Sequence, residues 1–346
     1  MSDATTMTEP GGANPGGSNP GGADPRGADP GVYDPATAAR QLAKGVWLLD
    51  TGFQGRGGVV AAYLLIGSEG LTLVETGAGS TLDNLRAAVA LTGHDLSQLK
   101  HILVTHIHLD HAGAAGALVR EFPHVDVRVH PFGVPHLADP SKLVSSASRI
   151  YGDRMEELWG EVVPIPESQV REVNDGELLK VSGRRLMTVF SPGHAPHHVA
   201  YFDLDTRIAF TGDAGGVRMP ETEYVVAPTP PPDLDEAVWK KSIHGLRSMR
   251  AQTLCPTHFG PFTDVQPHLE RVEESLDELL TIGREAADAG LDREALAAQI
   301  HATMATHLGD VHPGILANLE WATPSYVSAM GLERLARKRS EAAGSV

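Results

Sequence analysis

Short apolar runs bounded by glycine, proline or charged residues recur through the first two-thirds of the chain. Their length and β-branched character predict strands. The predicted strands are 46–50, 59–66, 71–75, 102–105 and 125–129, then three short strands between 186 and 210, and one at 253–255. Two helices are predicted between them, at 82–91 from the spacing of Leu82, Leu85 and Val89, and at 112–120, which is rich in alanine and glycine. This alternation favours two sheets sandwiched between helices.

The last third of the chain changes to helical periodicity. Asp233, with Glu236 three residues later, resembles a capping box and predicts a helix that runs to about Met249. Further helices are predicted from the apolar stripe Leu269, Val272, Leu276 and Leu279, and over 291–304 and 315–336. The pattern leaves open whether this part packs on the core, covers a functional site or forms a homodimer interface.

Composition narrows the class of protein. A hydrophobic content of 41% supports a sizeable core, and a net charge of −16 disfavours nucleic-acid binding, which needs a basic face. Cys255 is the one cysteine, so no intrachain disulfide can form, and no base pairs with it in sequence to make a nucleophile. No stretch approaches the roughly 18 apolar residues of a membrane span. The N-terminus lacks a basic start and an apolar core, so we expect a cytoplasmic protein.

The densest group of metal-competent side chains directly follows the predicted strand 102–105. It reads His106-Ile107-His108-Leu109-Asp110-His111. Side chains alternate in an extended segment, so His106 and His108 point the same way, and after a turn Asp110 and His111 can face a second point. Imidazole and carboxylate are ligands of zinc, iron and manganese. This stretch therefore predicts part of two adjacent metal sites.

Three more candidate ligands follow in order. His194, Asp213 and His258 each come just after a short apolar run, beside glycine or proline. Loops at strand ends commonly build active sites on sheets. Histidines of this kind are often only solvated loop residues, but the ordered series of ligand-like motifs disfavours that interpretation.

The series His106-x-His108-x-Asp110-His111, His194, Asp213, His258 resembles the metallo-β-lactamase-fold superfamily over roughly residues 40–265. The resemblance implies an α/β fold, a four-layer αββα sandwich. It also implies two divalent metal ions, zinc by preference, with iron or manganese as alternatives. His106, His108 and His194 would hold one ion, Asp110, His111 and His258 the other, and Asp213 with a hydroxide would bridge them. Glu75 stands where many members carry aspartate, and either supports a metal ligand or caps a strand end.

The strings around His108, His194 and His258 are most similar to the glyoxalase II-like branch. That resemblance implies a hydrolase that cleaves a small ester, thioester or lactone by attack of metal-bound hydroxide. Asp213 would fix the metal spacing, and Asp110 would ligate one metal and orient the hydroxide or pass on its proton. A small-molecule substrate is expected, without a nucleic-acid or membrane partner. A phosphodiesterase, a single-iron persulfide dioxygenase and a non-catalytic metal-binding protein remain alternatives.

The expected organisation has three parts. Residues 1–36 form a Gly/Pro-rich tail with a five-residue repeat, predicted to be disordered because it has almost no large apolar side chains. Residues 37–265 form the catalytic domain and 266–346 a C-terminal helical extension. Pocket-lining residues are expected from 131–170 and 215–232. Outside the ligand set, the candidates for the pocket are His130, His136, His197 and His198, whereas His124, His244, His268 and His301 are expected at the surface or in packing.

Overall fold

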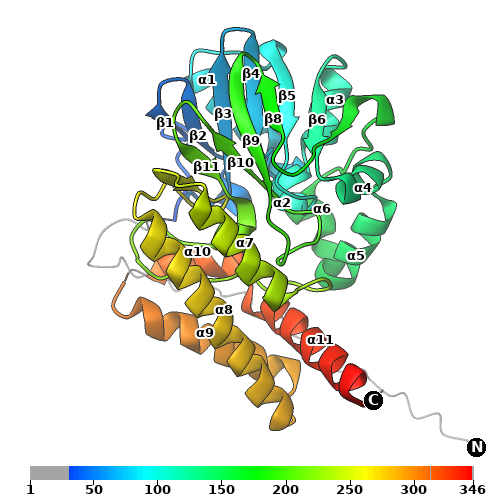
Figure 1. The fold of residues 1–346 in the computed structure, drawn as a ribbon, viewed down its shortest axis with the longest axis vertical. Helices are drawn as coiled ribbons and strands as arrows, with labels where there is room; N and C mark the ends of the chain where they lie inside the picture. The colour runs from blue at the N-terminus through cyan, green and yellow to red at the C-terminus, as the bar shows by residue number, and fades with distance from the viewer. Residues whose placement is uncertain (1–30, 312, 345–346) are drawn as a thin grey trace, which may run out of the picture.

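The computed structural model describes residues 31–311 and 313–344, and within them the strands form two sheets (Figure 1). The first sheet has the order β1 (Ala39–Ala43), β2 (Val46–Asp50), β3 (Ala61–Gly67), β4 (Gly70–Val74), β5 (Leu99–Leu103), β6 (Asp126–Val129), β7 (Val170–Glu172). The second has the order β12 (Thr253–Cys255), β11 (Ile208–Phe210), β10 (Val199–Asp203), β9 (Arg184–Phe190), β8 (Leu178–Val181).

Parallel pairing in both sheets explains where the site lies. β4, β5, β6 and β7 run parallel, and so do β11 and β12, whereas the other pairs are antiparallel. The carboxyl ends of parallel strands meet at one edge of a sheet, where ligands usually bind. The chain leaves these edges into the segments that carry His106, Asp213 and His258.

The two sheets pack face to face through apolar and aromatic side chains. Tyr63 of β3 lies against Phe210 of β11, with ring centroids 5.1 Å apart. The Tyr201 hydroxyl of β10 donates to the carbonyl of Val104, 3.0 Å away, just after β5. These contacts fix the ends of β5 and β11 relative to each other.

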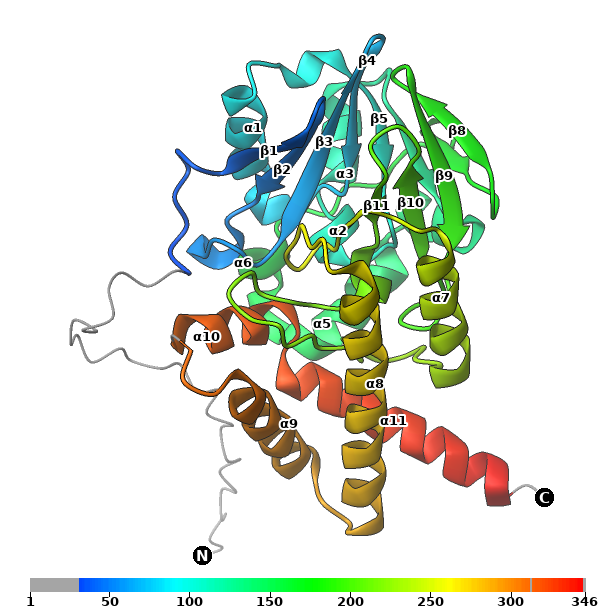
Figure 2. The same ribbon diagram turned by 60° about the vertical axis from the view of Figure 1, so that its left-hand side comes forward.

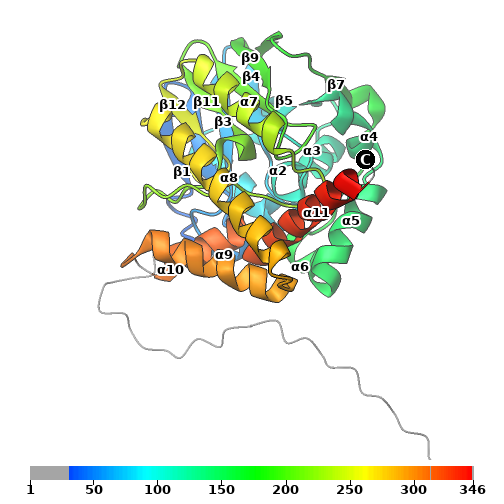
Figure 3. The ribbon, with the colours of Figure 1, turned by 60° about the horizontal axis from the view of Figure 1, so that its bottom comes forward.

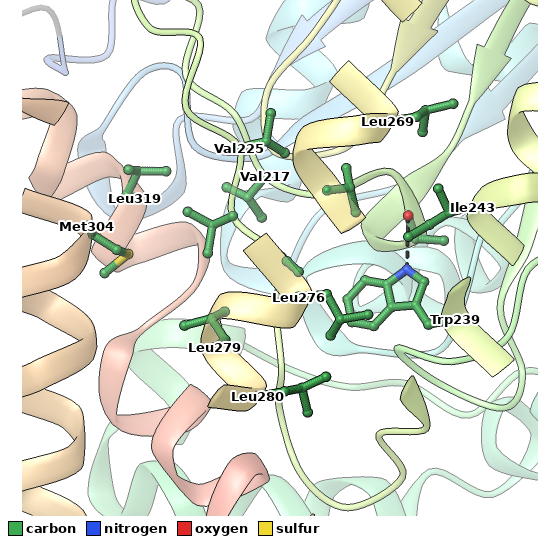
Figure 4. Packing of buried hydrophobic residues seen from close by; sticks show 14 of the residues in the cluster. Val217, Val225, Trp239, Ile243, Leu269, Leu276, Leu279, Leu280, Met304 and Leu319 are labelled. Carbon is green, nitrogen blue, oxygen red and sulfur yellow. Dashed lines mark hydrogen bonds between the residues drawn. The ribbon is translucent and has the colours of Figure 1, made fainter. Parts of the chain in front are cut away.

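Helices cover both outer faces, which gives the predicted αββα sandwich. α1 (Leu82–Leu91) and α3 (Ala115–Glu121) pack on the first sheet, and α7 (Glu236–Ser248) and α8 (Val265–Asp288) on the second. Figure 2 shows α1 on one side of the sheets and α7 with α8 on the other. The second outer core centres on the fully buried Trp239, packed with Ile243, Leu269 and Leu276 (Figure 4).

The C-terminal part is helical, as predicted, with α8 followed by α9 (Arg293–Leu308), α10 (Pro313–Ala322) and α11 (Ser325–Gly344). The continuous helical pattern predicted over 315–336 is in fact two helices. Pro324 separates them, because proline lacks a backbone N–H and disfavours helical backbone in the residue before it. Thr323 and Pro324, between the two helices, are among the residues that line the cavity described below.

Two other local predictions need correction. Asp235, not Asp233, caps α7, because its side chain accepts from the backbone N–H of Val238 at 3.1 Å and Glu236 is already the first helical residue. The predicted helix 112–120 is divided into α2 (Leu109–Ala112) and α3. Between them, a Cβ on Gly113 would lie 3.1 Å from the Ala78 Cα, so the glycine allows the expected close backbone approach.

Most predicted strands are present with bounds displaced by a few residues, and 46–50 and 253–255 match. The strands absent from the prediction, β1, β7 and β8, all lie at sheet edges. Edge strands expose one side, so they carry polar residues and lack the continuous apolar run of a central strand. The four-residue β8, for instance, alternates exposed and buried positions.

The predicted tail is described only in part, because residues 1–30 lie outside the described residues. Val32 pairs with Arg56, and the Tyr33 ring packs where a Cβ on Gly52 would be, 2.7 Å away. Among the described helices, none combines the length and apolar character needed to cross a membrane.

Candidate metal centre

Four loops carry the candidate ligands to one place. The loop after β5 holds His106 and His108 and leads into α2 with Asp110 and His111. Asp213 lies in a short 3-10 helix, Gly212–Gly215, directly after β11. Gly212 has φ +48°, and a Cβ there would lie 2.5 Å from the Thr105 hydroxyl, so the turn needs glycine. Trp239 holds this turn from the other side, donating its indole N–H to the Ala214 carbonyl at 3.1 Å (Figure 4).

The first ligand cluster contains His106, His108, His194 and Asp213. His108 Nδ1 lies 2.8 Å from His106 Nε2 and 3.3 Å from His194 Nε2. Asp213 Oδ2 lies 3.3 Å from His194 Nε2 and 4.0 Å from His106 Nε2. Three imidazole nitrogens and a carboxylate oxygen thus face one point.

The second cluster contains Asp110, His111 and His258. Asp110 Oδ2 lies 3.2 Å from His258 Nε2 and 3.6 Å from His111 Nε2. The other oxygen of Asp213, Oδ1, lies 3.3 Å from His111 Nε2 and 3.5 Å from His258 Nε2. Asp213 therefore directs one oxygen to each cluster, as a bridging carboxylate does.

Unpaired polar atoms show that these residues fit metal ions. His111 Nε2, His258 Nε2 and Asp213 Oδ1 are buried and make no hydrogen bond. Buried polar atoms are normally satisfied, and leaving one unpaired is unfavourable. Here three such atoms converge, and all belong to ligand types of divalent transition metals. The two clusters of histidine and aspartate are therefore suited to a metal site.

The second ring nitrogen of three histidines is held by an acceptor. His258 Nδ1 donates to the Val59 carbonyl at 2.8 Å, and His194 Nδ1 to the Pro228 carbonyl at 3.0 Å. His111 Nδ1 donates to Glu75 Oε1 at 3.0 Å. A proton on Nδ1 leaves the Nε2 lone pair free for a metal and fixes the ring orientation.

Glu75 supports a ligand rather than capping a strand. Its buried carboxylate accepts from His111 Nδ1, from the Thr105 backbone N–H at 3.2 Å and from the Thr257 hydroxyl at 3.2 Å. Its φ of +63° lies in the left-handed region, an unfavourable conformation for a residue with a side chain. This turn directs the longer glutamate side chain under the ligand loops, linking the segments of His111 and His258.

Burial and neighbouring charges shift the histidine pKa values of the two clusters differently. Burial lowers the pKa of His108 to about 3 and that of His106 well below its ordinary value, assisted by the neighbouring histidines. Burial also opposes protonation of His111, but the carboxylates of Asp110 and Asp213 outweigh it and raise its pKa. Asp213 keeps a pKa well below its usual range because His111, His194 and His258 outweigh its burial. The first cluster thus presents neutral imidazoles, and the second couples imidazoles to carboxylates.

A cavity of about 470 Å³ opens beside the clusters. His108, Asp110, His194 and Asp213 line one end of it. Its walls come from both segments expected to contribute, within 143–159 and 228–232, and also from 320–328 between and within α10 and α11. The C-terminal helices therefore cover the site, which the sequence left open. Phe53, from the loop after β2, is a wall residue that the sequence analysis missed.

The other candidate histidines are not among the residues lining this cavity. His198 bonds to the Ser191 hydroxyl at 2.8 Å and accepts from the Ala214 N–H at 3.3 Å, so it holds loops together. His197 is buried beside the first cluster, 6.1 Å from the His106 ring, and His130 packs on Phe190. His136 lines a separate cavity of about 540 Å³.

The four histidines expected at the surface or in packing stay outside the ligand clusters. His268 is buried in packing and donates to the Gly215 carbonyl at 2.7 Å. His124 donates to the Leu99 carbonyl at 2.9 Å. His244 is exposed, and the half-exposed His301 pairs with Glu320.

Comparison with known proteins places this geometry in a family. A model of the metallo-β-lactamase superfamily matches residues 55–258. A metallo-β-lactamase fold-containing protein of Sulfurisphaera tokodaii is 25% identical over 245 residues, which span 70% of this chain and 86% of that protein. A crystal structure of a metallo-β-lactamase family protein from Thermus thermophilus superposes with a TM-score of 0.65 at 22% identity, covering 87% of this chain and 95% of that one.

Two relatives with named activities match over shorter lengths. An atrochrysone carboxyl ACP thioesterase of Aspergillus fumigatus is 26% identical over 62% of this chain and 54% of its own length. A hydroxyacylglutathione hydrolase of Aeromonas salmonicida is 31% identical over 36% of this chain and 34% of its own length. The chain thus spans about half and about a third of these two proteins. The family match covers more than half of this chain and contains all seven clustered ligands, so the chain belongs to the metallo-β-lactamase superfamily.

Proposed function

We propose that this protein is a dinuclear metal-dependent hydrolase that cleaves an ester, thioester or lactone bond of a small molecule. The observation that carries the proposal is the position of Asp213, whose two carboxylate oxygens face the two ligand clusters at the end of a cavity. The thioesterase and the hydroxyacylglutathione hydrolase among the relatives support the choice of bond. Zinc is the proposed metal, with iron or manganese as alternatives for the same donors.

The seven residues have distinct tasks in this proposal. His106, His108 and His194 would hold one ion, Asp110, His111 and His258 the second, and Asp213 both. When bound, the two ions supply Lewis acidity for the scissile carbonyl and make a water acidic enough to be a nucleophile near neutral pH.

The carboxylates of Asp213 and Asp110 have different roles in this proposal. Both line the cavity, but the Asp213 side chain is only 7% exposed and would act as a fixed spacer, whereas the Asp110 side chain is 20% exposed. Asp110 is therefore the carboxylate that can orient the attacking water and accept its proton. Burial and the nearby Asp110 raise the pKa of Tyr151, so this cavity-lining hydroxyl stays protonated and can donate to a substrate oxygen.

Metal analysis and a substrate panel test the proposal together. Protein expressed with ample metal and purified without chelator should contain about two divalent ions per chain. The same preparation should hydrolyse a generic thioester or lactone with a higher kcat/KM than bis(p-nitrophenyl) phosphate. A preference for the phosphodiester would make the protein a phosphodiesterase. One iron per chain would favour the dioxygenase, and two metals without turnover of any class would favour a binding protein.

A further inference from the structure

Apart from its metal-ligand end, most of the residues that line the cavity are apolar or aromatic. Three segments distant in sequence build it, and Figure 3 shows two of them, α5 (Ser141–Tyr151) with α6 (Met155–Trp159) and α11, at the same end of the molecule. The segment of α5 and α6 contributes Leu143, Ala147, Ile150, Tyr151, Leu158 and Trp159. The loop before α7 contributes Pro228 and Pro230–Pro232. The segment of α10 and α11 contributes Trp321, Ala322, Pro324, Tyr326 and Val327. A polar substrate would find few partners along this wall.

Aromatic packing keeps the wall in place. The Phe53 ring stacks on Trp159 with centroids 5.5 Å apart and meets the edge of Trp321 at 6.2 Å. Tyr151 contacts Trp159 edge to face at 5.1 Å. Stacked and edge-to-face arrangements are the ones that aromatic pairs prefer, and each adds about 0.5–1.5 kcal/mol beyond the area that it buries. The cavity is therefore preformed, as most small-molecule sites are.

The charged groups of the wall are already paired. Outside the ligand clusters, the charged lining residues among those described are Arg154 and Glu320. Arg154 pairs with Glu157 at 3.1 Å and lies over the Trp321 ring at 5.5 Å. Glu320 pairs with His301 at 2.7 Å and accepts from the Ser325 N–H at 3.1 Å. An anionic or cationic substrate tail would have to displace one of these partners.

From this wall we infer that the cavity binds the acyl group of the substrate, and that this group is uncharged, apolar and much larger than acetyl, such as octanoyl or an arylacyl chain. The inference rests on the proposed function, because the scissile carbonyl must lie at the end formed by His108, Asp110 and Asp213. The cavity is continuous with that end, so an acyl chain extending from the carbonyl enters it. A volume of about 470 Å³ lies within the range of sites for drug-sized ligands.

A series of p-nitrophenyl esters from acetyl to decanoyl tests the inference on the metal-loaded full chain. Each added methylene should raise kcat/KM about three- to fourfold until the cavity is full, which corresponds to about 0.8 kcal/mol per buried methylene. The variant Ala147→Trp should lower the octanoyl-to-acetyl ratio of kcat/KM at least tenfold, because the indole would occupy the cavity. Ala302→Trp, on the exposed face of α9, is the matched control and should keep the wild-type ratio.

A binding measurement gives a readout besides turnover and remains usable if Ala147→Trp does not fold. The neutral fluorophore N-phenyl-1-naphthylamine should bind the wild-type protein and be displaced by octanamide but not by acetamide. Equal kcat/KM for acetyl and octanoyl esters would overturn the inference and leave the proposed function intact. Displacement by octanamide without hydrolysis of any acyl substrate would support the cavity assignment and overturn the proposed function. Tighter fluorophore binding after deletion of residues 1–30 would show that this segment is the occupant instead.

Discussion

The metal centre and the cavity wall adjoin each other but are built in opposite ways. The centre takes its seven ligands from four short motifs at strand ends, and hydrogen bonds from second ring nitrogens hold several of them in place. The wall takes apolar residues from helices and loops that lie between Phe53 and Val327 in the sequence, held by ring stacking and proline backbone. Under the proposed function, the centre would define the chemistry and the wall would select the molecule that reaches it.

The two ligand clusters differ in a similar way. The nitrogens of the first cluster lie close to one another, whereas His111 Nε2 and His258 Nε2 of the second have no hydrogen-bond partner and face carboxylates. Glu75 braces the second cluster, and the Pro228 carbonyl braces the first. Because Pro228 also lines the cavity, the first cluster and the wall share a support that the second cluster lacks.

The largest effect is expected from the ligands themselves. Asp213→Ala and His108→Ala should each abolish turnover and lower the metal content, because one removes the bridge and the other a ligand nitrogen. Elemental analysis and a thioesterase or lactonase assay on the same preparation measure both. His244→Ala, an exposed histidine of α7, should change neither quantity. Full metal and near-wild-type rates in either variant would remove that residue from the ligand set.

Replacement of Glu75 should affect the metal affinities of the two clusters differently. Glu75→Gln keeps the shape but weakens the acceptor for His111 Nδ1, and loss of such a support typically lowers metal affinity 10- to 100-fold. Titration of metal-free protein with zinc should show one weakened site and one site close to wild type. Equal weakening of both sites, or of neither, would contradict a role that acts mainly on the cluster of His111 and His258.

Gly331 links α11 to the wall and the first cluster. A Cβ there would lie 1.9 Å from the Thr229 carbonyl, in the loop whose Pro228 carbonyl holds His194. Gly331→Ala should destabilise the protein by about 1–3 kcal/mol and weaken zinc binding at the first cluster, because the loop must move. Calorimetry and the same zinc titration measure the two effects.

The matched control is Gly245→Ala in α7. A Cβ at Gly245 meets nothing within 4 Å, so alanine should stabilise the protein by up to about 1 kcal/mol through helix propensity. Similar zinc affinities in the two alanine variants would argue against coupling between α11 and His194.

The smallest effect concerns the N-terminal segment. Deletion of residues 1–30 should leave the melting temperature unchanged, because that repeat has almost no large apolar side chains. Deletion of residues 1–36 also removes the Tyr33 ring and its N–H bond to the Gly55 carbonyl. It should lower the melting temperature by about 2 °C, the effect of about 1 kcal/mol in a chain of this size. A lower melting temperature after removal of residues 1–30 would show that these residues dock on the domain.

Strands and helices with a buried face were predictable because their side chains face one environment over many residues. Strand 46–50 and helix 82–91 agree with β2 and α1 for this reason. The edge strands β1 and β7 were not predictable, since neighbouring strands rather than their own apolar content hold them. The start of α7 was misplaced because Asp233 and Asp235 are equally good caps in sequence, and only the backbone at Asp235 places its carboxylate on the Val238 N–H.

The sequence by itself pointed to the seven residues that the structure gathers in two clusters, because each stands just after an apolar run and their order resembles that of the family. It could not determine the role of Glu75, which depends on a left-handed turn that brings its carboxylate beneath two other loops. Only the tertiary structure decided that α10 and α11 close the cavity and that its charged wall residues are paired. The physical reason is the sequence distance over which the interactions act. Strand periodicity is a local pattern, whereas an apolar wall forms where distant segments bury surface together. No short sequence pattern indicates which of these segments meet.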